Sequence, residues 1–318
     1  MGYIVVMGRD MATSQDFVNW VCDSKKLDYN FLKYVLIAEK TAFRRFSSGA
    51  VHQTIYYPEV KAFHICHPPL AEQRRIVTIL DEAFDGIGTA KAHAEKNIQN
   101  ARDLFESHLQ SIFMGREDGW VEMTLGNATS GVLTGPFGSL LHKSDYVENG
   151  IPLVNPAHIT DTGIEPDLRK TVSNETARRL SSYIMREGDI VIGRRGEMGR
   201  CALVTKAEAG WLCGTGSFFI KPSDQCDPRY LVRFLRSAGC KRKLEEIAGG
   251  AVMPNLSNAD LANLRINMPP IKRQRAIVSE IDGFAGEVES LGEIYQRKLA
   301  ALDELKQSLL HQAFSGAL

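Results

Sequence analysis

The stretch PPLAEQRRIVTILDEAF at residues 68–84 recurs as PPIKRQRAIVSEIDGF at residues 269–284. The two copies align at an offset of 201 residues, and the same offset places Phe113 on Phe314 far downstream. Chance similarity does not hold one offset over so many positions. The chain therefore contains an internal repeat, and each copy is expected to form a similar structural unit.

The repeat extends upstream of both copies. LDYNFLKYVL at 27–36 resembles CDPRYLVRFL at 226–235. Nearer the prolines, Gly49-Ala50-Val51 matches Gly250-Ala251-Val252. Residues 1–69 match only the last part of the longer segment that precedes the second copy, with SQDFV (14–18) falling near GSFFI (216–220). Most of that longer segment has no counterpart in the first copy.

Each copy begins a long helix. The quoted proline pairs stand where proline is tolerated at a helix start, and Gly115 and Gly316 stand just past the ends, where glycine terminates helices. We predict helices at about 70–114 and 271–313. At 1.5 Å per residue each would be about 60 Å long.

Both helices carry an apolar stripe at alternating spacings of three and four, which is typical of a coiled-coil seam. In the second helix the stripe comprises Ile281, Phe284, Val288, Leu291, Tyr295, Leu302, Leu305 and Leu309. In the first it is narrower and richer in alanine: Ile76, Leu80, Ala83, Ile87, Ala94, Ile98, Ala101, Phe105 and Ile112. The matching stripes favour antiparallel pairing of the helices, and the alternative is that each packs only on its own domain.

The segment between the helices has a different character. Short β-rich runs punctuated by glycine and proline predict strands at 151–159, 188–196, 199–205 and 216–222. A helix is predicted at Pro228–Ile247, with an apolar face formed by Leu231, Phe234, Leu235, Leu244 and Ile247. The basic residues on its other sides, Arg229, Arg233, Arg236, Lys241, Arg242 and Lys243, form either a solvated face or one that contacts phosphates.

These elements define the expected fold class, α+β, with mixed, mostly β domains joined by two long antiparallel coiled-coil helices. The expected boundaries are 1–69 for the end of a first domain, 70–115 for the first helix, 116–268 for a complete domain and 269–318 for the second helix.

The composition limits the classes of protein to which the chain can belong. The 318 residues include 38 basic and 38 acidic side chains, so a face that binds nucleic acid has to be local. No apolar run is long enough to cross a bilayer and the N-terminal stretch lacks the pattern of a signal peptide, so we expect a cytoplasmic protein. The six cysteines show no CxxC spacing, and we expect reduced thiols in small core sites and no metal.

Signatures of a DNA-modifying enzyme are missing from the sequence. It contains no GxxxxGK[ST] phosphate loop and no [ND]PP[YFW] stretch, and Asn155-Pro156-Ala157-His158 resembles the latter only superficially. The glycine-rich segments at 135–139 and 193–199 lack the strand-GxGxxG-helix setting of a dinucleotide site. They are more typical of tight turns that present side chains. A self-contained nuclease or methyltransferase is therefore disfavoured.

The order of a recognition domain, a proline-led helix, a second domain and a second proline-led helix resembles the specificity subunit of Type I restriction-modification enzymes. The resemblance rests on the two quoted helix starts, on TGPFGSLLHKSDYVENGIPLVNPAHI (134–159) and on GDIVIGRRGEMGRCALV (188–204). It covers nearly the whole chain. The departure from the family pattern is the missing front of the first recognition domain.

The resemblance implies a non-catalytic subunit in which each recognition domain reads one half of a split target in double-stranded DNA, with the helices as spacer. It further implies methyltransferase subunits docked on the helices and a motor-nuclease subunit, with S-adenosylmethionine and ATP on those partners and no cofactor in this chain. Self-association through the long helices is a further option. The alternative function is a truncated assembly or regulatory subunit that occupies the methyltransferase partners without reading DNA.

Candidate DNA-binding residues follow from the chemistry of groove readout, in which arginine or lysine recognises guanine and asparagine or glutamine recognises adenine. Base-reading candidates displayed from turns are Lys143, Asn155, His158, Arg194, Arg195, Arg200 and Asn255. Candidates for phosphate contacts are Ser139, Arg178, Arg179, Lys241 and Arg242. For each, the competing interpretation is a surface or salt-bridged side chain. Expected partner-binding residues on the second helix are Leu291, Leu302 and Leu305.

Overall fold

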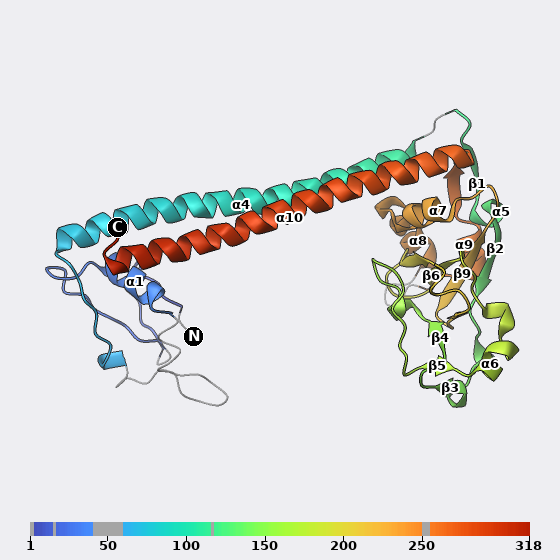
Figure 1. Ribbon diagram of the computed structural model, residues 1–318, viewed down its shortest axis with the longest axis horizontal. Helices are drawn as coiled ribbons and strands as arrows, with labels where there is room; N and C mark the ends of the chain where they lie inside the picture. Colours follow the sequence, from blue (N-terminus) through green and yellow to red (C-terminus); the bar gives the residue numbers. More distant parts are fainter. Residues whose placement is uncertain (1–2, 15–16, 41–59, 116–117, 250–254) are drawn as a thin grey trace. The chain divides into compact units, whose positions relative to one another are not determined.

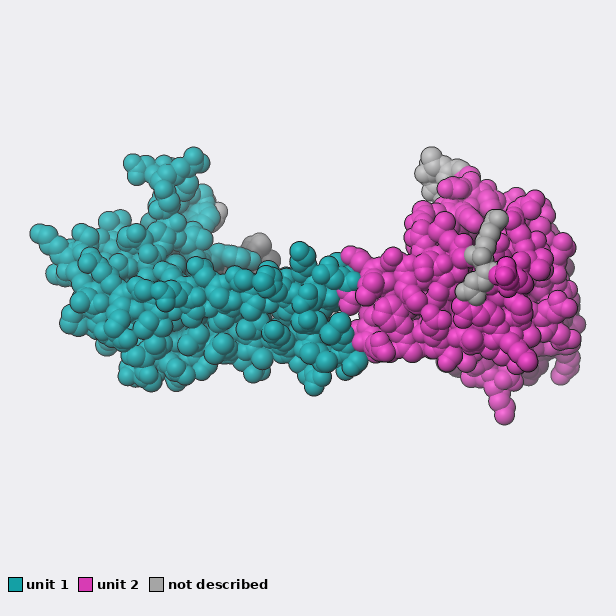
Figure 2. All heavy atoms as spheres, turned by 90° about the horizontal axis from the view of Figure 1, so that it is seen from above, with its two compact units in different colours: residues 1–100, 290–318 teal, residues 101–289 magenta. Residues whose placement is uncertain are grey.

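A computed structural model describes residues 3–14, 17–40, 60–115, 118–249 and 255–318. The repeated Gly-Ala-Val triplets at 49–51 and 250–252 lie outside the described residues. The chain divides into two compact units, shown in different colours in Figure 2. Unit 1 contains residues 1–100 and 290–318, and unit 2 contains residues 101–289. Each unit is described separately below.

Two long helices dominate the chain (Figure 1). Helix α4 runs over Leu70–Met114 and α10 over Ile271–Ser315, 45 residues each. Both begin directly after the quoted proline pairs, and Gly316, with a φ of 80°, follows the last residue of α10. The prediction of two proline-led, glycine-terminated helices is confirmed.

The two helices pair antiparallel within each unit. In unit 1, Lys91 Nζ lies 2.7 Å from Asp303 Oδ1, and Asn97 Nδ2 donates to the Tyr295 hydroxyl at 2.8 Å. In unit 2, the rings of Phe105 and Phe284 lie 5.6 Å apart. Residue numbers fall along α10 as they rise along α4, so the predicted antiparallel coiled coil is confirmed.

The predicted stripe of α4 is confirmed, since all nine of its members are buried or half-buried. In α10 the prediction is wrong at two of its positions: Leu291 is 38% exposed and Leu305 is 48% exposed. Their neighbours Gly292 and Lys306 lie half-buried instead. The lysine stem fits the seam because its ammonium lies 4.9 Å from the centre of the Phe84 ring and its methylenes can cover apolar surface. The third predicted partner-binding residue, Leu302, is half-buried.

The same buried glutamine contact recurs at the start of each long helix. Gln73 accepts from the Asp28 amide at 2.8 Å and donates to the carbonyls of Lys26 (2.9 Å) and Pro68 (2.7 Å). Its side chain also lies 3.3 Å from His67 Nδ1.

In unit 2, Gln274 accepts from the Asp227 amide at 2.7 Å and donates to the carbonyls of Gln225 (2.8 Å) and Pro269 (2.7 Å). Both glutamines are fully buried. The internal repeat is therefore a repeat of contacts as well as of residues.

A short helix begins beside each buried glutamine, and an aspartate caps the N-terminus of that helix. Helix α1 (Tyr29–Ala38) in unit 1 is capped by Asp28, and α7 (Pro228–Arg236) in unit 2 is capped by Asp227. The Phe31 ring of α1 meets Phe314 edge-on at 5.5 Å. The equivalent ring in α7, Tyr230, meets Phe113 at 5.7 Å.

Each core then extends along the paired helices. The unit 1 core comprises Phe31, Tyr34, Val35, Ile76, Val77, Leu80, Leu310 and Ala313.

The strands that the structure describes belong to unit 2. An antiparallel pair joins β1 (Val121–Thr124) to β10 (Arg265–Met268). An antiparallel sheet has the order β2-β9-β6-β7, and a second has the order β3-β5-β4-β8 with its last pair parallel. Their bounds are β2 Thr129–Thr134, β3 Tyr146–Val147, β4 Ile151–Val154, β5 Thr171–Val172, β6 Ile190–Gly193, β7 Cys201–Leu203, β8 Leu212–Cys213 and β9 Ser217–Pro222.

The four predicted strand regions contain β4, β6, β7 and β9, as expected from their β-rich composition. Short helices connect the strands: α5 Leu125–Ala128, α6 Asn174–Arg179, α9 Asn258–Ala262 and the 3-10 turns Gly138–Leu140, Lys143–Asp145, Pro156–His158 and Ser181–Tyr183.

The single helix predicted at Pro228–Ile247 is wrong, because the structure has two. Helix α7 ends at Arg236 and α8 (Ala238–Ala248) follows directly. At Ser237 the backbone is extended, with ψ at 145°, and the hydroxyl accepts from the amide of Cys240 while donating to the carbonyl of Phe234. Serine favours such a cap over a helix interior. Ile247, expected on the apolar face, is 42% exposed.

Four cysteines, Cys201, Cys213, Cys226 and Cys240, are buried and free as expected, whereas Cys66 is exposed and Cys22 is half-buried, against the prediction. Burial raises the pKa of the Cys201 thiol to about 11 and that of Cys240 to about 12, so both stay protonated near neutral pH. Among the described residues no helix is long and apolar enough to cross a membrane.

Candidate nucleic-acid interface

The candidate interface is centred on the turn between β6 and β7, residues 194–200. Two glycines with positive φ, Gly196 at 81° and Gly199 at 74°, let the chain reverse here. A Cβ at Gly199 would lie 2.7 Å from the Leu235 carbonyl oxygen and 2.8 Å from Lys241 Cγ, so the turn packs closely on α7 and α8. Helices α7 and α8 therefore hold the turn in place, so the side chains that it presents start from a fixed backbone.

Three predicted readers meet at this turn. Arg194 is half-buried, donates from Nε to the Leu256 carbonyl at 2.9 Å and lies 5.7 Å from the centre of the Phe218 ring. Arg195 and Asn255 are exposed, and Arg195 Nε donates to Asn255 Oδ1 at 3.3 Å. Arg194 thus anchors the turn, while Arg195 and Asn255 present hydrogen-bonding groups to solvent.

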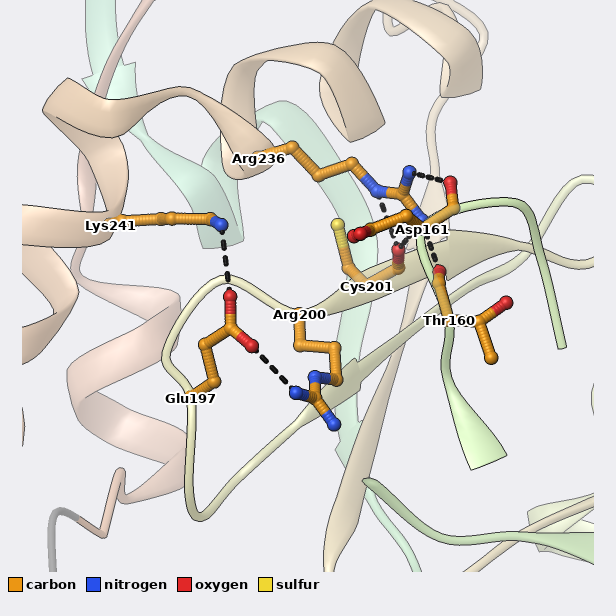
Figure 3. Close-up of polar contacts among 7 residues, drawn as sticks. All are labelled: Thr160, Asp161, Glu197, Arg200, Cys201, Arg236 and Lys241. Atoms are coloured by element: carbon orange, nitrogen blue, oxygen red, sulfur yellow. Dashed lines mark hydrogen bonds and ion pairs between the residues drawn. The ribbon is translucent and has the colours of Figure 1, made fainter. Parts of the chain in front are cut away.

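Glu197 joins two further candidates (Figure 3). Its Oε2 accepts from Arg200 at 2.6 Å and its Oε1 accepts from Lys241 Nζ at 3.2 Å. The Arg200 guanidinium, followed by the Lys241 ammonium, holds the pKa of the Glu197 carboxyl below its usual range. Arg200 and Lys241 therefore lie together but are paired with an acid in the unbound chain.

Arg236 fixes the base of the turn, a role that was not expected from its place among the basic residues of α7. Its guanidinium donates to the carbonyls of Cys201 (2.6 and 2.9 Å), Thr160 (2.9 Å) and Asp161 (2.5 Å), as Figure 3 shows. No signal in the sequence separates it from its basic neighbours, because its acceptors are backbone oxygens far away along the chain.

The other basic side chains of α7 and α8 divide into two groups. Arg229 and Arg233 both pair with Asp282 of α10, the second at 2.6 Å. Arg242 and Lys243 on α8 are exposed. The predicted basic face is thus used in part to fasten α7 to α10, and α8 carries the accessible charges.

The remaining candidates belong to other elements of unit 2. Asn155 and His158 bracket a 3-10 turn in which His158 Nδ1 lies 3.0 Å from the Leu153 carbonyl oxygen, so that ring nitrogen already has a partner. Arg179 donates to the Leu140 carbonyl and to Asp145, both at 2.8 Å. Three others are exposed: Ser139, Lys143 and Arg178.

The family of this chain follows from comparison with known proteins. The Type I restriction modification DNA specificity domain matches residues 1–99 and 138–296, which include the β6–β7 turn and most of both long helices. The chain belongs to this family. The specificity-domain match thus covers both units described above.

Two curated relatives of this chain are specificity subunits of Type I restriction enzymes. The specificity subunit of the Type I restriction enzyme EcoBI from Escherichia coli is 23% identical over 274 residues, 79% of this chain and 57% of the relative. The specificity subunit of MjaVIII from Methanocaldococcus jannaschii is 22% identical over 333 residues, 99% of this chain and 76% of the relative. The chain thus spans little more than half the length of the E. coli protein.

Solved structures of the family agree in fold. A chain from a structure of the type I R-M system superposes with a TM-score of 0.72 at 22% identity, covering 91% of this chain and 71% of that one. The HsdS subunit from Thermoanaerobacter tengcongensis gives a TM-score of 0.61 at 22% identity, with coverages of 91% and 70%.

Proposed function

We propose that this chain recognises DNA by sequence and directs the methyltransferase and motor-nuclease subunits of a Type I restriction-modification system to the target site. The observation that carries the proposal is the β6–β7 turn, which lies in a unit matched by a DNA specificity family. Arg195 of this turn and its partner Asn255 are exposed, and the turn contacts Lys241 of α8 through Glu197. An arginine and an asparagine are the side chains suited to reading guanine and adenine from the major groove.

Two roles divide the cations in this proposal. Arg195 extends from a turn braced by Arg194 and Arg236, so its direction is set well enough for a contact with one base. Arg242 and Lys243 lie exposed on α8, where they can bind a phosphate without being aligned to a particular base. A net charge of zero fits this arrangement, because only one face has to be basic.

The chain itself is proposed to be non-catalytic, with S-adenosylmethionine and ATP bound by the partner subunits. The alternative, an assembly subunit that does not read DNA, is less well supported, since the family match includes the turn and is not limited to the helices. Cytoplasmic localisation is part of the proposal, since the partners and their DNA target are there.

The long helices supply the proposed docking surface for the methyltransferase subunits. Leu291, Ile294 and Leu305 are exposed on the same helix, α10, beside the seam that pairs with α4. The exposed leucines that do not fill the seam are thus free to contact a partner. Self-association through this surface would compete with methyltransferase docking.

We expect Arg195→Ala to relax preference at one base pair and to cost about 1 to 3 kcal/mol of specific binding, because a bidentate guanine contact is lost. Arg242→Ala should weaken binding to all sequences alike and lower the salt slope by about one unit. Both variants, assembled with the methyltransferase subunits, would be titrated against a randomised target library at several salt concentrations.

The two variants serve as controls for one another, since each removes one positive charge from unit 2. If the Arg195→Ala complex keeps the wild-type preference at every position, Arg195 is not a reader. If the wild-type complex selects no sequence at all, the proposed function is wrong. Arg194→Ala is less informative, because the bond to the Leu256 carbonyl makes a loss of stability the expected result.

A further inference from the structure

Glu197 is the one acidic residue between Arg194 and Arg200 in the sequence of the β6–β7 turn. Each of its carboxylate oxygens holds a different cation: Oε2 accepts from Arg200, in the same turn, and Oε1 accepts from Lys241, on α8. Figure 3 shows the carboxylate between the two basic groups. Two oxygens that share one negative charge and hold two cations are also what a DNA phosphate offers.

The three side chains remain accessible to DNA. The side chain of Glu197 is 50% exposed, that of Arg200 is 40% exposed and that of Lys241 is 35% exposed. A phosphate could therefore approach both cations from solvent without opening the core. Exposed ion pairs of this kind are weak, so a phosphate can replace the carboxylate at a small cost in affinity.

The backbone around Glu197 is fixed, so exchange requires only a side-chain rotation. Arg236 holds the carbonyl of Cys201 at the start of β7 and those of Thr160 and Asp161. Gly199 packs on Leu235, which fixes the turn against α7. When the carboxylate turns away, the backbone that carries Arg200 stays in place.

We propose that Glu197 is an internal substitute for a DNA phosphate, which occupies Arg200 and Lys241 in the unbound chain and limits binding to non-target DNA. The proposal rests on the proposed DNA-reading function and adds to it a residue that sets the affinity for phosphates. At a non-target sequence the phosphate gains two cations but has to displace Glu197. At the target the same displacement is offset by the base contacts of the turn, so Glu197 lowers affinity for both sequences and only the sequence with base contacts stays tightly bound.

The test is Glu197→Gln, because an amide has the same shape but no charge with which to hold two cations. Binding of the full chain to a short random-sequence duplex would be followed by fluorescence anisotropy at several salt concentrations. We expect affinity for the random duplex to rise about three- to tenfold and the salt slope to steepen by about one to two units, since two cations become free to contact phosphates.

Glu187→Gln is the matched control, because it changes the charge of unit 2 by the same amount at an exposed position. It should raise affinity for the random duplex less than twofold, as expected for a change in net charge alone. In the double variant Glu197→Gln with Arg200→Gln, about half of the gain in slope should disappear. A thermal melt of each variant shows whether the turn still folds.

Three results would overturn the inference. If Glu197→Gln folds but binds the random duplex no better than Glu187→Gln does, Glu197 does not occupy the cations. If it loses preference at one base pair with unchanged affinity for the random duplex, Glu197 instead accepts from a cytosine amine. If the wild-type chain binds no DNA even at low salt, the proposed function and this inference both fail.

Discussion

Gln274→Leu is expected to lower the free energy of unfolding of unit 2 by about 3 kcal/mol, because three backbone groups around a fully buried side chain lose their partner at once. These are the amide of Asp227 and the carbonyls of Gln225 and Pro269. Leucine has a similar volume, so the effect reports lost hydrogen bonds more than a cavity. Guanidinium-induced unfolding followed by tryptophan fluorescence measures it.

Gln110→Leu, at an exposed position of α4 in unit 2, is the control and should change stability by less than about 0.5 kcal/mol. Gln73→Leu should destabilise unit 1 about as much as Gln274→Leu destabilises unit 2, because the two glutamines make equivalent hydrogen bonds. Wild-type stability in both buried variants would show that water or a backbone shift replaces the glutamine.

Leu310→Asp is expected to open unit 1, with a loss of about 4 kcal/mol or more, because an unpaired carboxylate would lie in the core with Phe31, Ile76 and Leu80. The leucine is 1% exposed. Hydrogen exchange of the α1 amides measures the opening directly. Protection of α1 equal to that in the wild type would contradict the assignment of Leu310 to this core.

Leu305→Asp on the same helix separates folding from docking. Because Leu305 is 48% exposed, the substitution should change stability by less than about 0.5 kcal/mol. Binding to the methyltransferase subunits should nevertheless weaken, if exposed leucines of α10 form the docking surface. Unchanged partner affinity in a folded Leu305→Asp chain would remove Leu305 from that surface.

The sequence predicts the elements that local signals specify. Proline and glycine mark the ends of α4 and α10, and the internal repeat predicts that both helices start in the same way. The four strand regions follow from their β-branched residues and flanking glycines. All these features depend on residues close together in the chain, so they are visible without a structure.

The sequence does not predict which side of α10 faces α4 at every turn. The rule that large apolar residues fill the seam selects Leu291 and Leu305, whereas the structure has Gly292 and Lys306 there. The rotation of α10 about its own axis is set in its first turns, where Gln274, Ile277 and Ile281 are buried. Seam positions along the rest of α10 follow from that rotation and not from the size of each side chain.

The use of each basic residue is equally invisible in the sequence. Arg233, Arg236 and Arg242 look alike, but the first pairs with Asp282, the second holds the Cys201 carbonyl and the third is exposed. Their partners lie dozens of residues away, so only the tertiary fold decides which arginine is accessible. For the same reason, nothing in the sequence marks Glu197, because Lys241, one of its two cations, lies 44 residues away.

The core of unit 1 has a consequence for synthesis on the ribosome. Phe31, Ile76 and Leu80 pack on Leu310 and Ala313, which are translated much later, whereas the residues of unit 2 follow one another without interruption. At ribosomal rates of roughly 5 to 20 residues per second the early residues wait roughly 10 to 55 s for their partners. During that interval unit 2 can close around the first turns of α10, while the apolar face of α1 stays exposed to chaperones and proteases.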